Sequence, residues 1–374
     1  MVKVGITGQA GFLGSHLFNF LGTKNENVAL INFKRSFFDD KSELQNFVKN
    51  CDVVVHIAAM NRHKDPSVIY STNINLVNKL ISACEETNSN PKIIFSSSTQ
   101  ENLDNHYGKS KRDGHQLLEK WVEKTKAQLI TMLIPNVFGP FGKPFYNSVV
   151  ATFCQQIAIN EKPTIHNDGL INLIYVNELI EKIYSAIISK EAKSVVKISV
   201  QPTASKKVSE ILALLISFKK QYIEKGIVPN VIKDSFEINL FNTFTSFIPK
   251  NYFPRKYMKH TDDRGAFVEI MRANTSGQSS YSTTVPGITR GNHYHTRKIE
   301  RFAVISGKAS IKWRKINTEK IYEFILDGNE PAYVDMPIWF THNITNIGDT
   351  ELITLFWINE PYDPEDSDTY FEVV

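Results

Sequence analysis

The stretch VKVGITGQAGFLGSHLFNFLG, residues 2–22, decides the fold of the first half of this chain. Residues 2–7 are a β-rich apolar run, and the segment from residue 12 has the leucine and phenylalanine spacing of a helix. The pattern GxxGxxG joins the two through Gly8, Gly11 and Gly14. Glycine there permits a tight turn and lets backbone N–H groups approach a pyrophosphate at a helix N-terminus. The stretch therefore predicts a dinucleotide site, with a tight turn that binds nothing as the alternative.

The alternation of strands and helices continues beyond this stretch to about residue 240. Four further β-rich runs are separated by amphipathic segments, and these runs are VALIN (28–32), DVVVHIA (52–58), KIIFSSS (92–98) and QLITMLI (128–134). Another amphipathic helix is expected over 208–225. Such alternation gives a parallel sheet with helices on both faces. We therefore predict a doubly wound α/β domain over residues 1–246.

The pattern changes after residue 247. The segment IPKNYFPRKYMKH (248–260) has two prolines and no clean period, which indicates a linker or the entry to a second domain. Short strands then follow one another without long helices, at 267–271, 280–285, 302–307, 309–314, 320–326, 332–336, 342–346 and 352–358. Strands at this spacing predict a small all-β sandwich or barrel over residues 247–374.

Bulk composition narrows the class of protein. The 374 residues favour two domains, and 42% hydrophobic with 22% charged residues is typical of a soluble globular protein. A net charge of +4, with scattered basic residues, argues against nucleic acid and suits a small anionic substrate. Three cysteines without metal or redox spacing, no signal peptide and no apolar run of about 18 residues predict a cytoplasmic protein with no membrane partner.

The first half also contains a group of candidate catalytic residues. Tyr107 and Lys111 are four residues apart, so on a helix they share a face. A nearby ammonium lowers the pKa of a phenol, which makes tyrosine a usable acid–base at neutral pH. A serine at the end of the strand KIIFSSS can hold a substrate oxygen beside that phenol.

The second strand ends in a pattern that bears on the choice of cofactor. An acidic residue usually stands there when the ribose 2′-hydroxyl of NAD is bound, whereas this strand ends in Asn32, followed by Lys34 and Arg35. Cations suit a 2′-phosphate, so the sequence predicts NADPH. Two solvated surface charges are the alternative.

These motifs together resemble the extended short-chain dehydrogenases/reductases, which act on nucleotide sugars and have a Rossmann-like fold. HIAA (56–59) and PNVFGP (135–140) extend the resemblance, although Leu133 and Asn177 depart from it at positions of substrate contact. The resemblance implies catalysis by Tyr107 and Lys111, with help from Ser98 or its competitor Thr99. It also implies cofactor contacts from Gly8, Gly11, Phe12, Leu13, Gly14, Asn32, Lys34, Arg35, Asp39, Ala58, Ala59, Asn73 and Pro135.

The second half contains histidines at metal-ligand spacing within GITRGNHYHTRKIERFAVISG (287–307). His293 and His295 are two apart, so on a strand they face the same side, and Glu300 and the distant His342 complete the set. Three imidazoles and one carboxylate suit Zn²⁺, Fe²⁺, Mn²⁺ or Ni²⁺, and of these we predict Zn²⁺. The alternative is core histidines satisfied by hydrogen bonds. The spacing resembles the two cupin motifs, with Trp339 where glycine is usual.

The same region resembles the sugar-nucleotide 3,5-epimerases of the cupin superfamily. The matching segments are DRGAFVE (263–269) and RGNHY (290–294). In those epimerases the histidine of RGxHY is the proton-abstracting base, but a histidine on a metal cannot also be a free base. The two resemblances therefore compete for His293, and we favour the metal. Lys298 is then the candidate acid–base residue, with a solvated rim lysine as the alternative.

Over nearly its full length the chain resembles the bifunctional UDP-sugar 3-epimerase/4-reductases of capsular polysaccharide synthesis. The resemblance implies a homodimer whose cupin inverts C3 of a UDP-2-acetamido-2,6-dideoxy-4-hexulose. The reductase domain then reduces C4 with NADPH, giving UDP-N-acetyl-6-deoxy-L-talosamine on the way to UDP-N-acetyl-L-fucosamine. The alternatives are a monofunctional reductase or UDP-sugar 4-epimerase with a non-catalytic cupin for dimerisation or sensing, and a nucleotide sensor without turnover.

Overall fold

A computed structural model describes residues 1–190, 193–229, 234–257, 259–262, 265–268, 277–360 and 363–374. By packing, the chain divides into two compact units. The first contains residues 1–152 and 167–208, and the second contains residues 153–166 and 209–374. No helix in the described part of the chain has both the length and the apolar character needed to cross a membrane.

The first unit is built on a parallel sheet of six strands in the order β2-β1-β3-β4-β5-β8. In chain order these are β1 (Val2–Thr7), β2 (Val28–Ile31), β3 (Val53–His56), β4 (Lys92–Ser98), β5 (Gln128–Ile134) and β8 (Val195–Ser199). The five runs predicted from the sequence form the first five of these strands. The order reverses direction at β1, as expected of a doubly wound fold.

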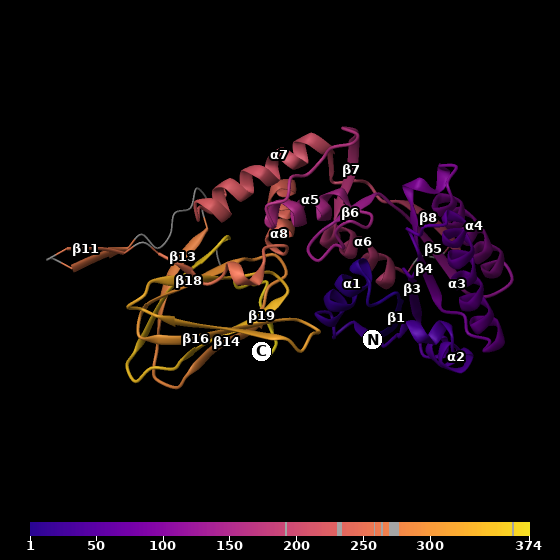
Figure 1. The fold of residues 1–374 in the computed structure, drawn as a ribbon. Coiled ribbons are helices and arrows are strands. Elements are labelled where there is room, and N and C mark those ends of the chain that lie inside the picture. Colours follow the sequence, from indigo (N-terminus) through magenta and orange to yellow (C-terminus); the bar gives the residue numbers. More distant parts are fainter. Residues whose placement is uncertain (191–192, 230–233, 258, 263–264, 269–276, 361–362) are drawn as a thin grey trace. The chain divides into compact units, whose positions relative to one another are not determined.

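Helices cover both faces of this sheet (Figure 1). Helices α1 (Phe12–Gly22) and α6 (Val176–Ile188) pack together on one face, and α2 (Lys41–Lys49), α3 (Pro66–Glu86) and α4 (His106–Val122) lie on the other. All four residues of β3 are buried, which is the pattern of a parallel strand covered on both sides. Phe33, Phe47, Val54, Phe95 and Trp121 belong to the core beneath α2, α3 and α4. The predicted α/β class is confirmed.

A second, three-stranded sheet follows in the order β6-β7-β9. Its strands are β6 (Asn136–Phe138), β7 (Leu170–Tyr175) and β9 (Ala204–Lys207). Helix α5 (Val149–Ala158) lies between β6 and β7 in the sequence. These strands are short and their polarity does not alternate cleanly, so they were not predicted from the sequence.

The second unit begins with helices. The helix predicted over 208–225 is α7 (Val208–Phe218), which continues into the π-helical turn η3 (Lys219–Glu224). Helix α8 (Ser235–Thr245) and the 3₁₀ turn η4 (Lys250–Tyr252) follow. Residues 209–245 thus belong to the same compact unit as the β-strands, whereas the sequence predicts that they belong to the first domain. The predicted domain boundary between 246 and 247 stays a prediction.

Two five-stranded antiparallel sheets form the body of the second unit, in the orders β10-β18-β15-β20-β13 and β17-β16-β19-β14-β21. The first contains β10 (Arg255–Lys256), β13 (Gln278–Thr284), β15 (Glu300–Ser306), β18 (Ala332–Met336) and β20 (Leu352–Ile358). The second contains β14 (Thr289–Tyr294), β16 (Lys308–Lys315), β17 (Ile321–Asp327), β19 (Phe340–Asn346) and β21 (Tyr370–Phe371). Ala309, Ile311 and Trp313 alternate along β16 and are fully buried, so one face of the strand forms core. The predicted all-β cupin is confirmed.

A pair of antiparallel strands, β11 (Lys259–Asp262) and β12 (Gly265–Val268), lies between β10 and β13 in the chain. It contains part of the DRGAFVE segment. Asp263, Arg264 and Glu269 of that segment lie outside the described residues.

Candidate active site and metal centre

The glycine turn after β1 has the geometry that the sequence predicts. Gly8 has φ +76°, and a Cβ there would lie 2.9 Å from the backbone nitrogen of Ala58. A Cβ on Gly14 would lie 2.1 Å from the Gly8 carbonyl oxygen, so only glycine lets α1 begin this close to β1. Helix α1 starts after Gly11, which has no side chain to cap the first N–H groups. Backbone donors at the head of α1, from Phe12 and Leu13 onward, therefore fit an anionic group.

Gln9 connects this turn to the end of the second strand. Its amide donates to Asn32 Oδ1 at 3.2 Å and accepts from the Phe33 backbone nitrogen at 3.2 Å. Lys34 and Arg35 follow directly and are exposed. The structure thus brings Asn32 to the glycine turn through Gln9, a residue that sequence reasoning missed because no motif marks it.

Asp39 lies further along the same segment and is largely exposed. Its carboxylate is 3.3 Å from the Lys79 ammonium on α3. The same ammonium donates to the Phe38 carbonyl at 2.6 Å. The predicted cofactor residue Asp39 therefore already has a partner that fixes the end of this segment to α3.

Asn73 fixes the segment that follows β3. Its side-chain amide donates to the Met60 carbonyl and to Ser110 Oγ, both at 2.9 Å, and its oxygen accepts from the Met60 nitrogen at 2.6 Å. The segment with Ala58 and Ala59 is thereby tied to α3 and α4. Pro135, predicted at the same site, is buried directly after β5.

Tyr107 and Lys111 lie on α4, one turn apart as predicted. The Lys111 ammonium donates to the Ser96 carbonyl at 2.7 Å and lies 5.7 Å from the centre of the Tyr107 ring. Burial lowers the pKa of Lys111 to about 8. Burial, with a smaller contribution from Tyr146, raises the pKa of Tyr107 to about 12.

The expected lowering of the Tyr107 pKa is therefore wrong for this chain by itself. A nearby ammonium attracts a phenolate, but in the folded chain both groups also lose the water around them. Burial disfavours the charged form of each residue, phenolate and ammonium alike. In the structure this effect exceeds the attraction between them.

Ser98 ends β4 and begins the 3₁₀ turn η2 (Thr99–Asn102). Its hydroxyl accepts from the Gln100 nitrogen at 3.1 Å, and the side chain is buried, whereas Thr99 is exposed. The turn is anchored from below by the buried Glu101, which accepts from Ser97 Oγ at 2.7 Å and forms an ion pair with Lys197. Glu101 and Lys197 thus fix the turn that follows Ser98. Sequence reasoning missed this pair because the two residues are far apart in the chain and belong to no motif.

The predicted metal ligands of the second unit converge. His293 lies near the end of β14, His295 follows that strand, Glu300 begins β15 and His342 lies in β19. The Glu300 Oε2 atom is 3.7 Å from His293 Nε2, 3.2 Å from His295 Nε2 and 2.8 Å from His342 Nε2. One ligand atom from each of the four lies within 4.8 Å of the others. His293 is half-buried and the other three are buried.

The electrostatics of this cluster favour a charged carboxylate. Burial by itself would raise the pKa of Glu300, but its close contacts with the three histidines hold that pKa well below its usual value. Burial opposes protonation of His295, yet its contact with Glu300 raises the pKa of that imidazole. Burial lowers the pKa of His342 despite the same carboxylate.

Hydrogen bonds on the far sides of two rings orient their lone pairs. His295 Nδ1 lies 2.6 Å from the Asp368 carbonyl oxygen, and His342 Nδ1 lies 3.1 Å from that of Phe340. A carbonyl oxygen only accepts, so both Nδ1 atoms carry hydrogen, and Nε2 is the atom of each neutral ring that is left to bind a cation. His295 Nε2 is buried and has no hydrogen-bond partner among the described residues. This donor set fits a divalent cation.

Trp339 stands where the cupin pattern usually has glycine, and its backbone explains the preference. Its φ is 62°, in the left-handed region that glycine adopts without strain. The indole is buried and stacked on Tyr294, with ring centres 5.7 Å apart. The Trp339 nitrogen also donates to the His295 carbonyl at 2.8 Å. The Trp339 side chain therefore packs on Tyr294 of β14, the strand that carries His293, while the Trp339 backbone keeps a strained conformation.

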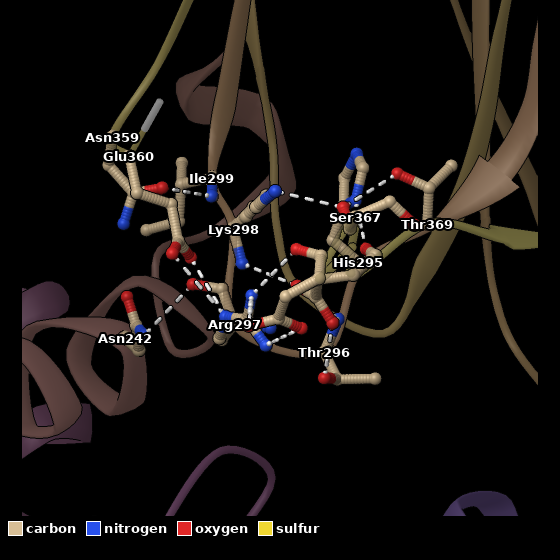
Figure 2. A network of polar contacts seen from close by, with 12 residues as sticks. Asn242, His295, Thr296, Arg297, Lys298, Ile299, Asn359, Glu360, Ser367 and Thr369 are labelled. Carbon is tan, nitrogen blue, oxygen red and sulfur yellow. Dashed lines mark hydrogen bonds and ion pairs between the residues drawn. The ribbon is translucent and has the colours of Figure 1, made fainter. Parts of the chain in front are cut away.

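Lys298 is buried, so it is not a solvated rim residue. Its ammonium donates to the Ser367 carbonyl at 2.8 Å (Figure 2). Its backbone nitrogen donates to the Asp368 carboxylate at 3.1 Å. Sequence reasoning missed Asp368 because it lies far from the histidine motif and belongs to no recognised pattern.

Comparison with known proteins finds a matching family for each half of the chain. The NAD dependent epimerase/dehydratase family matches residues 4–199, and the polysaccharide biosynthesis C-terminal domain family matches residues 260–370. The chain is 32% identical over 373 residues to a UDP-2-acetamido-2,6-beta-L-arabino-hexul-4-ose reductase of Pseudomonas aeruginosa, covering 99% of this chain and 98% of the relative.

Two further proteins share one or both halves. The crystal structure of the capsular polysaccharide assembling protein CapF from Staphylococcus aureus matches with a TM-score of 0.62 and 34% identity, and all of both chains is covered. The spore coat polysaccharide biosynthesis protein SpsL of Bacillus subtilis is 25% identical over 124 residues, covering 30% of this chain and 82% of that protein.

Proposed function

Because the chain belongs, along its whole length, to the family of the UDP-2-acetamido-2,6-beta-L-arabino-hexul-4-ose reductase, we propose that it is a bifunctional enzyme of nucleotide-sugar biosynthesis. Its second half inverts C3 of a UDP-2-acetamido-2,6-dideoxy-4-hexulose. Its first half then reduces the C4 ketone with NADPH. The product is UDP-N-acetyl-6-deoxy-L-talosamine, a precursor for capsular polysaccharide, and we propose a homodimer as the working form.

In the reductase half, Tyr107 donates a proton to the oxygen on C4. A pKa of about 12 keeps the phenol protonated at neutral pH, which is the form that a reduction requires. Lys111, on the same face of α4, stabilises the phenolate that forms, and Ser98 holds the ketone oxygen. When bound, the reduced nicotinamide supplies the hydride.

The glycine turn and the end of β2 hold that cofactor. Backbone donors at the head of α1 bind the pyrophosphate, and Gly8 leaves room for its approach. Lys34 and Arg35, both exposed beside Asn32, bind the 2′-phosphate of NADPH. Asn73 and Pro135 shape the remainder of the cofactor site.

In the second half, His293, His295, Glu300 and His342 hold a divalent cation, which we propose is Zn²⁺. The orphaned lone pair of His295 Nε2 beside the Glu300 carboxylate supports this assignment. The cation, when bound, supplies positive charge that can stabilise an enolate oxygen or brace the sheets. Lys298 is the proposed acid–base residue, and its buried ammonium is held by the Ser367 carbonyl.

The order of the two steps follows from the chemistry of the sugar. The proton on C3 is acidic only while C4 is a ketone, because the carbanion is then an enolate. Reduction of C4 removes the ketone and fixes the new stereocentre. Epimerisation must therefore precede reduction.

The observation that carries the proposal is that one family relationship spans both halves, and each half has its own cluster of reactive residues. The test incubates the purified protein in D₂O with isomers of a UDP-4-keto-6-deoxy-N-acetylhexosamine, with and without NADPH. We expect deuterium at C3 without NADPH, and oxidation of NADPH when it is present. NADPH oxidation without C3 exchange would leave a monofunctional reductase, and no oxidation with any isomer would contradict the reductase.

A further inference from the structure

The last residues of the chain lie against the strands that carry the proposed metal ligands. Strand β21 pairs with β14, with Phe371 opposite His293 and Tyr370 opposite Tyr294. The Glu372 nitrogen donates to the Asn292 carbonyl at 2.9 Å, and the Thr341 hydroxyl, next to His342, donates to the Glu372 carbonyl. The C-terminal segment, residues 363–374, therefore contacts both histidine-bearing strands.

The loop that joins His295 to Glu300 takes its shape from this part of the chain (Figure 2). The backbone nitrogens of Thr296, Arg297 and Lys298 donate to the Asp368 carboxylate at 3.1, 2.9 and 3.1 Å. The next nitrogen, of Ile299, donates to Asn359 Oδ1 at 2.9 Å. All four N–H groups between two metal ligands thus bind side-chain oxygens more than fifty residues away in the sequence.

Asp368 also orients one ligand directly. Its backbone carbonyl accepts from His295 Nδ1 at 2.6 Å, which fixes the tautomer and the plane of the ring. The residue is only 4% exposed and has φ 43°, a left-handed conformation that aspartate and asparagine tolerate better than most residues. In this conformation its carbonyl binds the His295 ring while its carboxylate binds the backbone of the 296–299 loop.

An outer layer of charges surrounds this arrangement. The Arg297 guanidinium binds Glu360 at 3.1 Å and Asp366 at 2.7 Å. These groups are more than a third exposed, and solvent screens ion pairs of this kind. The buried carboxylate of Asp368, and not the exposed acids, is therefore placed to control the ligand loop.

We propose that Asp368 is a positioning residue of the metal centre, which sets the His295 ring and the 296–299 loop so that His295 and Glu300 reach one cation. This inference rests on the proposed metal site. Groups that orient a ligand typically contribute about 10- to 100-fold in metal affinity. The end of the chain is thus part of the metal centre.

The test measures Co²⁺ affinity by competition with a chromophoric chelator, together with the visible absorption of the bound Co²⁺, for the full chain. Asp368→Asn keeps the size and backbone of the residue but places an NH₂ group against backbone donors. We expect its affinity to fall by about 10- to 100-fold and its Co²⁺ spectrum to shift. The control Asp366→Asn removes the same charge from the same segment and should retain the affinity and spectrum of the unaltered protein.

A second pair of variants covers the case in which Asp368→Asn does not fold. The Thr296 hydroxyl donates to Asp368 Oδ1 at 2.6 Å. Thr296→Val loses this donor and should weaken Co²⁺ binding several-fold, whereas Thr296→Ser keeps a hydroxyl and should bind Co²⁺ like the unaltered protein. Unchanged affinity and spectrum in Asp368→Asn or in Thr296→Val would overturn the positioning role, as would an equal loss in Asp366→Asn. No Co²⁺ binding by the unaltered protein would instead overturn the proposed metal site itself.

Discussion

The reductase site and the metal centre are assembled in opposite ways. Ser98, Tyr107 and Lys111 follow one another along a single strand, turn and helix of the first unit. The proposed metal ligands lie on β14, β15 and β19 or, for His295, directly after β14, and the loop between two of them is bound by Asp368 near the end of the chain. The first site is a local motif on a parallel sheet, whereas the second exists only when two sheets and the C-terminal segment have come together.

The two sites also treat buried charge differently. Lys111 is buried with a neutral carbonyl as its hydrogen-bond partner, so its pKa falls. Glu300 is buried in close contact with three imidazoles, so its pKa is held well below the usual range. Burial destabilises a charge unless the surrounding dipoles and ions replace water. The first site has a cation that can lose its proton, and the second has an anion suited to a metal.

The comparison predicts that the reductase chemistry can be removed without affecting the metal centre. Tyr107→Phe removes the proton donor, so we expect the rate of NADPH oxidation to fall about 10³-fold while deuterium exchange at C3 persists. Steady-state kinetics and mass spectrometry measure the two. Tyr70→Phe, which loses a phenol bound to Asp113, is the control and should keep its rate. A Tyr107→Phe enzyme with an ordinary rate would refute the assignment.

The converse change should affect only the metal centre. Glu300→Gln keeps the shape of the side chain and removes the single negative charge among the four ligands. Because even groups that merely orient ligands contribute about 10- to 100-fold, we expect metal affinity to fall by more than about 100-fold. Competition with a chelator measures this, with the exposed Glu323→Gln as control. Retention of metal by Glu300→Gln would show that the four residues are not the ligands.

The buried cation predicts a pH dependence of stability. Below about pH 8 Lys111 is charged in the folded and unfolded chain, and above 10.5 it is neutral in both. Between these values the unfolded chain binds more protons, so the unaltered protein gains stability relative to Lys111→Met as pH rises, by about 3 kcal/mol at most. Urea unfolding of both proteins at pH 7 and pH 10 measures the difference. A constant difference would mean that Lys111 keeps its ordinary pKa.

The smallest effect concerns the choice of cofactor. Two exposed cations contribute about 0.5–1 kcal/mol each, so replacing Lys34 and Arg35 by serine should raise KM for NADPH about tenfold and leave KM for NADH unchanged. Initial rates with each cofactor measure this. Lys49→Ser, which removes an exposed cation at the end of α2, is the control. An equal change for NADPH and NADH would mean that the two residues do not bind the 2′-phosphate.

Elements whose residue pattern repeats within one short segment were predicted correctly from the sequence. Helix α1 spans the residues that its leucine and phenylalanine spacing indicates, and the five predicted parallel strands are all present. Prediction failed where an element is short or mixed in character, as with β6, β7 and β9. It also misjudged the pKa of Tyr107, because the degree of burial at a helix surface is set by what packs over it.

By itself the sequence determined the glycine turn, the Tyr107–Lys111 pair and the spacing of the histidines, because a turn, a helical repeat and a strand repeat are local geometry. Only the tertiary structure decided that Glu101 pairs with Lys197, that Gln9 reaches Asn32 and that Asp368 binds the ligand loop. These contacts join residues far apart in the chain, and packing of the folded units, not spacing along the sequence, brings them within bonding distance.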